Sequence, residues 1–333
     1  MNCYLCDVEL TEQNRSDEHI IPSALGNNLT DSDLICRSCN NGLASQIDNA
    51  LIEQVGGLYE LVLQARPGTR ADAVTNGRLD DGTPIKFIGE LHPQIPVQIH
   101  LPGIAPVKFV AVRDKVEAVA REKLTQLKGR FKDLDVEKML ANMEIVEYPD
   151  RLVFFGNSKI PGVSEVGGLP FFRGIKKTAV NFYLQKGGDK KYILDIIDQV
   201  KTGQPAPSVI SKFYYPGIRH VHVPSEHEVA HIIKLVGEPV MGVLYCHVAL
   251  FNTNAALILL NENYDGPAIN HQYHYDLLKR QHLTDPITLP IKHRSHIIDH
   301  FNIHRDTSAD DNASYQRTRR VIEEFIRQKG AFI

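Results

Sequence analysis

Two Cys-x-x-Cys units, CYLC at residues 3–6 and CRSC at residues 36–39, flank the stretch DEHIIP at residues 17–22. They contain four of the five cysteines in the sequence. Two residues between paired cysteines let both thiolates reach one ion from a tight turn, and four thiolates satisfy the tetrahedral preference of zinc. The pattern therefore predicts a structural zinc ion held by Cys3, Cys6, Cys36 and Cys39. Cys246 lies alone in an apolar stretch and is expected to be a small buried hydrophobe.

The pattern after the second cysteine pair is that of a helix. Apolar residues recur there at spacings of three and four, which predicts one apolar helix face. They are Leu43, Ile47, Leu51, Ile52 and Val55. Gly56-Gly57 is expected to end or bend this helix, with a further turn or two over residues 58–64. The N-terminal unit is therefore predicted to be a zinc-stapled hairpin followed by a helix, with a domain boundary near residue 70.

The remaining chain alternates strand-like and helix-like runs without a βαβ repeat, which indicates a mixed α+β domain. Helices are expected near residues 115–129, 136–143, 171–184, 190–200, 293–301 and 313–328. Polar residues interrupt the apolar stretch 240–260, so we expect two strands around a turn there and no membrane span. The first residues form no apolar leader, and the chain is expected to be cytoplasmic.

The ordered set CxxC, EHIIP, LG, CxxCNN and ID is similar to the zinc-stapled branch of the HNH endonucleases, whose fold is the ββα-metal unit. The similarity covers about the first 55 residues, and beyond residue 70 there is only a loose likeness to C-terminal regions that accompany such modules in bacterial proteins. It implies an α+β chain with a treble-clef-like HNH ββα-metal nuclease domain at residues 1–70. A larger α+β domain for specificity, sensing or oligomerisation then spans residues 71–333.

The resemblance also implies roles for single residues. His19 is the candidate base that takes a proton from water, which suits an imidazole at neutral pH. Glu18 and Asn40 are the implied ligands of a catalytic Mg²⁺ or Mn²⁺. In an extended strand alternate side chains share a face, so Asp17 rather than Glu18 would point the same way as His19, and either acid remains a candidate ligand. The family's bracing Asn has no clear counterpart, and Asn28 ranks first among the candidates.

The implied function is a metal-dependent endonuclease that hydrolyses phosphodiester bonds in nucleic acid, DNA rather than RNA, in anti-phage defence or in a mobile element. One such site cuts one strand, so a double-strand break would need a homodimer or successive nicks. Residues 1–55 hold two arginines against nine acidic residues, a formal charge of −7. Substrate affinity is therefore expected from the larger domain or a second subunit. The candidate cations are Arg173, Lys176 and Lys177 on one helix and Arg317, Arg319 and Arg320 on another.

Two other functions are open. The first is a non-catalytic zinc module that binds nucleic acid or protein, in which His19 has no chemical role. The second is a zinc metallopeptidase built on His227, Glu228 and His231, which fit the HExxH pattern of two histidines on one helix face with a glutamate base. Ser225-x-x-Glu228 is a capping box that gives Glu228 a structural role, and the peptidase ranks last.

Overall fold

The computed structural model describes sixteen segments of the chain. They are residues 1–26, 28–65, 74–79, 84–88, 90–100, 107–112, 115–128, 134–141, 143–145, 153–155, 169–204, 224–225, 228–289, 291–298, 317–318 and 320–321. The chain forms two compact units: Met1–Val62 with Glu165–Phe325, and Leu63–Ser164 with Ile326–Ile333. This division differs from the expected consecutive domains 1–70 and 71–333, because residues after 164 return to the first unit.

The first unit begins with the expected hairpin and helix. Strands β1 (Arg15–His19) and β2 (Thr30–Cys36) form a two-stranded antiparallel sheet in which His19 lies opposite Thr30. A register shift between Ser16 and Glu18 marks a bulge in β1. The short helix α1 (Arg37–Cys39) continues through a π-helical turn (Asn40–Ala44) into the long helix α2 (Ser45–Ala65). A 3₁₀ turn (Ser23–Leu25) lies in the loop between the strands.

Helix α2 runs through Gly56-Gly57 without ending, so of the two alternatives predicted there, an end or a bend, the end is wrong. Its buried face continues on both sides of the glycines, through Val55, Leu58 and Val62. Two helical glycines cost about 1 kcal/mol each relative to alanine, which the burial of several aliphatic side chains outweighs.

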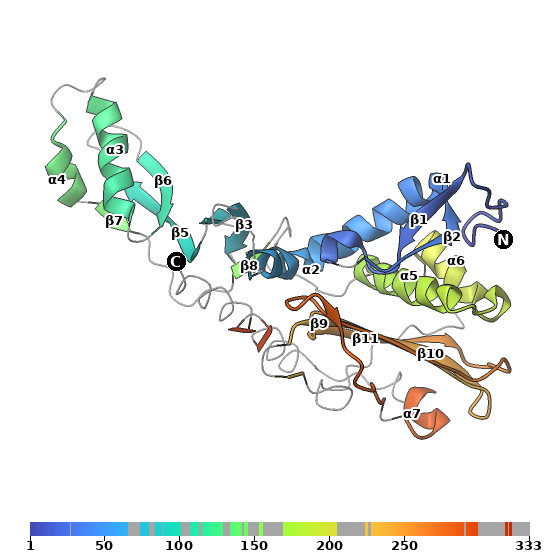
Figure 1. Cartoon of the computed structure of the whole chain (residues 1–333). Coiled ribbons are helices and arrows are strands. Elements are labelled where there is room, and N and C mark those ends of the chain that lie inside the picture. The colour runs from blue at the N-terminus through green and yellow to red at the C-terminus, as the bar shows by residue number, and fades with distance from the viewer. Residues whose placement is uncertain are drawn as a thin grey trace. The chain divides into compact units, whose positions relative to one another are not determined.

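Helix α5 (Leu169–Gln185) lies between the hairpin and a second sheet, contacting β2 on one side and β9, β10 and β11 on the other (Figure 1). A side chain at Gly174 of α5 would place its Cβ 2.8 Å from the Cβ of Leu51, so glycine is what lets α5 pack this closely on α2. A 3₁₀ turn (Lys190–Tyr192) and α6 (Leu194–Thr202) follow. The helical pair expected near residues 171–184 and 190–200 is therefore present.

The second sheet of the first unit is antiparallel, with strand order β11-β10-β9-β12-β13. Its strands are β9 (Ala230–Glu238), β10 (Val243–Leu250), β11 (Asn254–Asn261), β12 (Ile269–Asp276) and β13 (Gln281–His282). The apolar stretch 240–260 thus forms two strands around a turn, as predicted. Helix α7 (Arg294–Ile298) packs on the sheet through Ile297. No helix in the described part of the chain is long and apolar enough to cross a membrane.

The second unit has its own sheet, with order β6-β5-β4-β3-β8 and β7 paired to β5. The strands are β3 (Val74–Leu79), β4 (Pro84–Ile88), β5 (Glu90–Ile99), β6 (Val107–Val112), β7 (Met143–Ile145) and β8 (Val153–Phe155). Helices α3 (Val116–Lys128) and α4 (Val136–Ala141) accompany it. Ile99, Ala120 and Leu124 form part of its core. Mixed helices and antiparallel sheets in both units confirm the α+β class.

Candidate functional site

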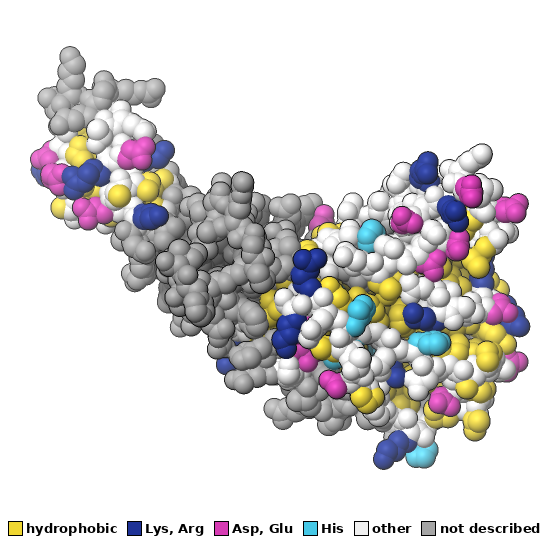
Figure 2. All heavy atoms as spheres, in the orientation of Figure 1, with side chains coloured by type: hydrophobic (Ala, Val, Ile, Leu, Met, Phe, Trp, Pro, Cys, Tyr) yellow, Lys and Arg dark blue, Asp and Glu magenta, His cyan; other side chains and the backbone are white. Residues whose placement is uncertain are grey.

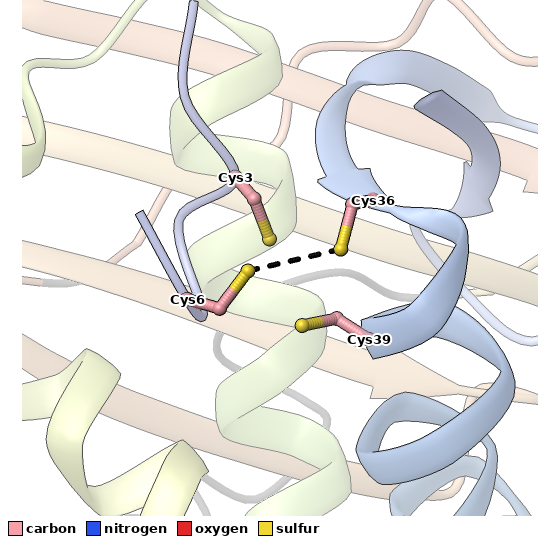
Figure 3. A group of neighbouring side chains, drawn as sticks. All are labelled: Cys3, Cys6, Cys36 and Cys39. Atoms are coloured by element: carbon pink, nitrogen blue, oxygen red, sulfur yellow. Dashed lines mark hydrogen bonds between the residues drawn. The ribbon is translucent and has the colours of Figure 1, made fainter. Parts of the chain in front are cut away.

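The four N-terminal cysteines converge on one point, with their Sγ atoms all within 4.8 Å of one another (Figure 3). The Sγ atoms of Cys6 and Cys36 are 3.7 Å apart. Four sulfurs at the zinc–sulfur distance of about 2.3 Å define tetrahedral edges of about 3.8 Å, so this spacing fits a zinc ion. With all four positions taken by thiolates, such a site stabilises the fold and leaves no open position for a substrate.

The knuckle that carries the first pair is a tight turn. The amide of Asp7 donates to the carbonyl of Cys3 at 2.9 Å, and the amide of Cys3 donates to the carbonyl of Val8 at 2.8 Å. Asp7 has a φ of 61°, which closes the turn. The second pair lies where β2 passes into α1. The fifth cysteine, Cys246, is fully buried in β10, where burial raises the pKa of its thiol.

The side chains of β1 alternate between two environments at its C-terminal end. Asp17 is exposed and His19 is half-buried, whereas Glu18 between them is only 1% exposed. Asn40, at the start of the π-helical turn, donates through Nδ2 to Ser16 Oγ at 3.0 Å and to the Asp17 carbonyl at 3.1 Å. These two bonds fix the first turns of the helix against the strand that carries His19. Both use the amide nitrogen of Asn40 as the donor.

Glu18 faces α5 and belongs to a buried ion cluster. Its carboxylate pairs with the ammonium of Lys177, which also lies 2.9 and 3.1 Å from the two carboxylate oxygens of Asp48 in α2. Burial raises the pKa of Glu18 and of Asp48, against the opposing effect of Lys177. Burial also opposes the charge of Lys177, but the two carboxylates outweigh it and raise its pKa. His19 lies near enough for its charge to favour ionised Asp48.

Two side-chain amides of α5 reach the end of the hairpin. Asn181 Nδ2 donates to Glu18 Oε1 at 2.8 Å and lies 3.5 Å from the carbonyl oxygen of His19. Gln185 Nε2 donates to the carbonyl of Thr30 at 3.1 Å. Because His19 and Thr30 are opposite each other in the sheet, α5 contacts both strands where the hairpin carries His19.

Asn28, ranked first as the bracing residue, is exposed in the loop before β2. The side-chain amide that contacts the backbone of His19 is that of Asn181 instead. Within the same loop Gly26 has a φ of 91°, and the ring of Tyr59 from α2 packs directly against it. The chain can pass under this ring because glycine has no side chain and tolerates the left-handed backbone conformation.

The basic residues of α5 do not form the exposed cationic face that the sequence suggested. Arg173 donates to the carbonyls of Val200 and Lys201 at the end of α6, and Lys176 donates to a side-chain oxygen of Gln199 at 2.6 Å. Burial lowers the pKa of Lys176 to about 8. The prediction was wrong because α5 is buried on nearly every side, so its cations turn to internal acceptors.

The second candidate cluster has one described member with internal bonds and one outside the described residues. Arg317 donates to the carbonyls of Ser225 and Glu228, whereas Arg319 lies outside the part of the chain that the structure describes. On the face shown in Figure 2, basic side chains over the N-terminal module are single and interspersed with acidic ones.

The described residues of the HExxH pattern, Glu228 and His231, form no metal site. His231 lies in β9 rather than on a helix and is fully buried. Its Nε2 donates to the carbonyl of Leu25 at 2.8 Å, and its Nδ1 accepts from the amide of Phe251 at 3.3 Å. Burial lowers its pKa to about 4, so the ring is neutral and both nitrogens are engaged. His227 lies outside the described residues.

Glu228 has a structural role instead of a catalytic one. Its carboxylate accepts from the amide of Ser225 at 3.1 Å, the contact that the capping box predicts. It also accepts from Asn252 Nδ2 and from His274 Nε2, both at 3.1 Å. These contacts, together with the strand conformation of His231, contradict the metallopeptidase. The ranking of the peptidase last agrees with these contacts, and an apolar run with two histidines fits a buried strand as well as a helix.

Sequence reasoning missed the contacts that α5 makes with the hairpin. The sequence motifs present Lys177 only as a candidate substrate-binding cation and indicate no role for Asp48 or Asn181. One pattern could have indicated them: Lys177, Asn181 and Gln185 recur every four residues along one side of a largely apolar helix. Polar residues at helical spacing in a buried helix indicate specific polar partners.

Residues 3–55 match the model of a family described as HNH endonuclease. No curated protein and no solved structure matches the chain. The matched segment begins at the first zinc-site cysteine and ends within α2, so it contains the cysteine cluster, the hairpin with His19, and Asn40. The N-terminal part of the chain is therefore an HNH endonuclease-type module with a four-cysteine site suited to zinc.

Proposed function

We propose that this protein is a metal-dependent endonuclease that hydrolyses phosphodiester bonds in nucleic acid, with His19 as the base that activates water. One observation carries the proposal: His19 lies half-buried at the end of β1, in a hairpin next to the cysteine cluster and within the segment that matches the HNH family. A half-buried imidazole can exchange protons with water and still be held in place, as a general base must be.

Asp17 and Asn40 are the residues that would hold a catalytic Mg²⁺ or Mn²⁺. Asp17 offers an exposed carboxylate, and Asn40 offers a carbonyl oxygen from the helix that it ties to the same strand. Oxygen ligands of this kind suit Mg²⁺, which neutralises charge on the phosphate and on the departing 3′ oxygen when bound. Glu18 is the weaker candidate because its carboxylate already accepts from Lys177 and Asn181 away from solvent.

The substrate we propose is DNA, held by a part of the protein other than the acidic module. The module carries a formal charge of −7, and the cations of α5 are engaged internally. Binding of a polyanion therefore requires basic groups elsewhere in residues 71–333 or in a second copy of the chain. A homodimer would also explain cutting of both strands. Cytoplasmic anti-phage defence or a mobile element is the biological setting we propose, with the larger region as specificity or sensing element.

The test is plasmid cleavage by the full chain with Mg²⁺, Mn²⁺ or EDTA. We expect metal-dependent nicking that falls by about 10²–10⁴ in His19→Ala, the usual contribution of a general base. His271, an exposed histidine of β12, provides the matched control: His271→Ala should cut like the wild type. Equal cleavage by wild type and His19→Ala would contradict the assignment of the base. Intact plasmid in every lane, with zinc fully bound, would favour a non-catalytic binding module.

A further inference from the structure

We infer that α5 positions the catalytic base: Asn181 holds the end of β1 that carries His19, and Gln185 holds the facing residue of β2. The hairpin is then competent only while this helix of the later segment is docked on it. The inference rests on the proposed role of His19 and adds a positioning residue from outside the segment that matches the family.

The contacts form a stripe along one side of α5. Lys177, Asn181 and Gln185 follow each other at intervals of four residues, which places them one above the other on a helix. Lys177 binds the side chain of Glu18. Asn181 binds the same side chain and the carbonyl of His19, and Gln185 binds the carbonyl of Thr30. The three contacts therefore begin beside the base and end on the strand opposite it.

The hairpin needs such support because it is small. β1 has five residues and pairs only with β2 in its sheet, and an isolated two-stranded sheet is marginally stable in water. The zinc ligands lie beyond the other end of the strand pair, where Arg15 faces Cys36. The α5 contacts hold the end that lies farthest from the cysteine pairs, where His19 faces Thr30.

The burial of Asn181 distinguishes a positioning role from a role in substrate binding. Asn181 is 0% exposed, so it cannot touch a nucleic acid and must act through the residues it binds. Asn181 Oδ1 and Gln185 Oε1 are buried without a hydrogen-bond partner among the described residues. An apolar residue in either place would avoid that unfavourable burial. Stability alone therefore does not explain why amides occupy these positions. Their donors, which hold the two strands of the hairpin, do explain it.

The first test compares Asn181→Leu with a matched control in cleavage by the full chain. Leucine keeps the size of the side chain and removes the donor. Because small displacements of a catalytic group cost large factors in rate, we expect kcat to fall tenfold to a hundredfold with KM for plasmid unchanged. Gln185→Leu should show the same change to a smaller degree.

Asn261 is the matched control, since its Nδ2 also donates to a backbone carbonyl, that of Tyr192, far from His19 in the chain. Asn261→Leu should leave kcat and the pH profile as in the wild type. Equal losses in Asn181→Leu and Asn261→Leu would overturn the inference.

If Asn181→Leu does not fold, Asn181→Asp keeps the shape of the side chain. Its buried carboxyl can donate to Glu18 only while it is protonated. Its activity should then fall as pH rises, with Glu18, Lys177, Asp48 and His19 as neighbouring ionisable groups, and a wild-type pH profile would overturn the inference.

A second measurement needs no cleavage. NMR spectra of the histidine rings in the zinc-loaded protein at one fixed pH, with His19 assigned by its loss in His19→Ala, should show a changed chemical shift for His19 in Asn181→Leu and none in Asn261→Leu. An unchanged His19 resonance in Asn181→Leu would overturn the positioning role even if the wild type cuts DNA. A changed resonance in a wild type that cuts nothing would support the contact and reject the nuclease, so the two failures are distinguishable.

Discussion

The two ends of the N-terminal module are held by different chemistry. At one end the four cysteines come from the first 39 residues, and a single ion can join them. At the other end the partners of Glu18, Asp48, His19 and Thr30 lie 129 to 163 residues away, on α5. The cysteines of the first end all come from the N-terminal segment, although Asp7 in their knuckle also pairs with Lys190. The second end makes residues after 164 part of the candidate site. A module that a short motif identifies is thus not a module that stands alone.

Loss of the zinc site should have the largest effect on stability, because it removes the ion that joins the four cysteines at one end of the module. Structural zinc in such sites contributes on the order of 10 kcal/mol of apparent binding free energy. Cys36→Ser should abolish stoichiometric zinc and lower the melting temperature strongly, as measured by elemental analysis and calorimetry. Cys246→Ala is the control, with zinc content unchanged and a loss of about 1 kcal/mol. A Cys36→Ser protein that keeps its zinc and its melting temperature would contradict the site.

Breaking the ion cluster of Lys177, Glu18 and Asp48 tests the end of the module that α5 contacts. Lys177→Met leaves Glu18 and Asp48 buried without their cation, which costs about 3–5 kcal/mol. Lys176→Met, one position earlier, removes a bond to the neutral Gln199 and should cost about 1 kcal/mol. Urea denaturation of both variants measures the difference. The same loss of unfolding free energy in both variants would show that the ion cluster contributes no more to stability than the bond of Lys176 to Gln199.

Acid should weaken the sheet on which α5 rests. Burial lowers the pKa of His231 and of His247 to about 4, so the folded protein resists a proton that the unfolded chain binds below about pH 6.5. Stability is therefore complete above that pH and is lost as pH falls toward 4, by about 3 kcal/mol for each ring. His247→Leu removes one ring that faces Lys234 and Leu257 on the neighbouring strands. Its unfolding free energy should fall less between pH 7 and pH 4, and a slope identical to that of the wild type would argue against this origin.

The smallest expected effect separates Asp17 from Glu18, which lie on opposite sides of β1. Asp17→Asn should raise the Mg²⁺ concentration for half-maximal cleavage about tenfold, a change of about 1.4 kcal/mol in metal affinity. Glu18→Gln should leave that concentration unchanged and lower the melting temperature, because it weakens the pair with Lys177. Titration of both variants with Mg²⁺ decides between them, and the reverse result would make Glu18 the ligand.

What could be predicted from the sequence was local. The spacing of the cysteines and the periodicity after Cys39 predicted the cysteine cluster and the hairpin-then-helix order, because both depend on residues close in the chain. The helix does not end at Gly56-Gly57, one of the two alternatives predicted there, because packing of Leu58 and Val62 outweighs local helix propensity.

The contacts of α5 could not be predicted from single positions. Asn181 and Glu18 are 163 residues apart, and nothing near either residue in the sequence identifies the other. The family's bracing Asn has no clear counterpart in the sequence, and the side-chain amide that contacts the carbonyl of His19 comes from Asn181, far along the chain. The strand environment of His231 could not be predicted for the related reason that its partners, Leu25 and Phe251, come from two other parts of the fold.

The separation of His19 and Asn181 by 162 residues has a consequence for synthesis of the chain. Ribosomes add about 5–20 residues per second, so helix α5, which contacts the hairpin, emerges roughly 10–30 seconds after His19. During that interval the cysteine end can already bind its ion while the strand that carries His19 lacks its distant support. Competence to cut nucleic acid would therefore be delayed until the later segment has been translated and has docked.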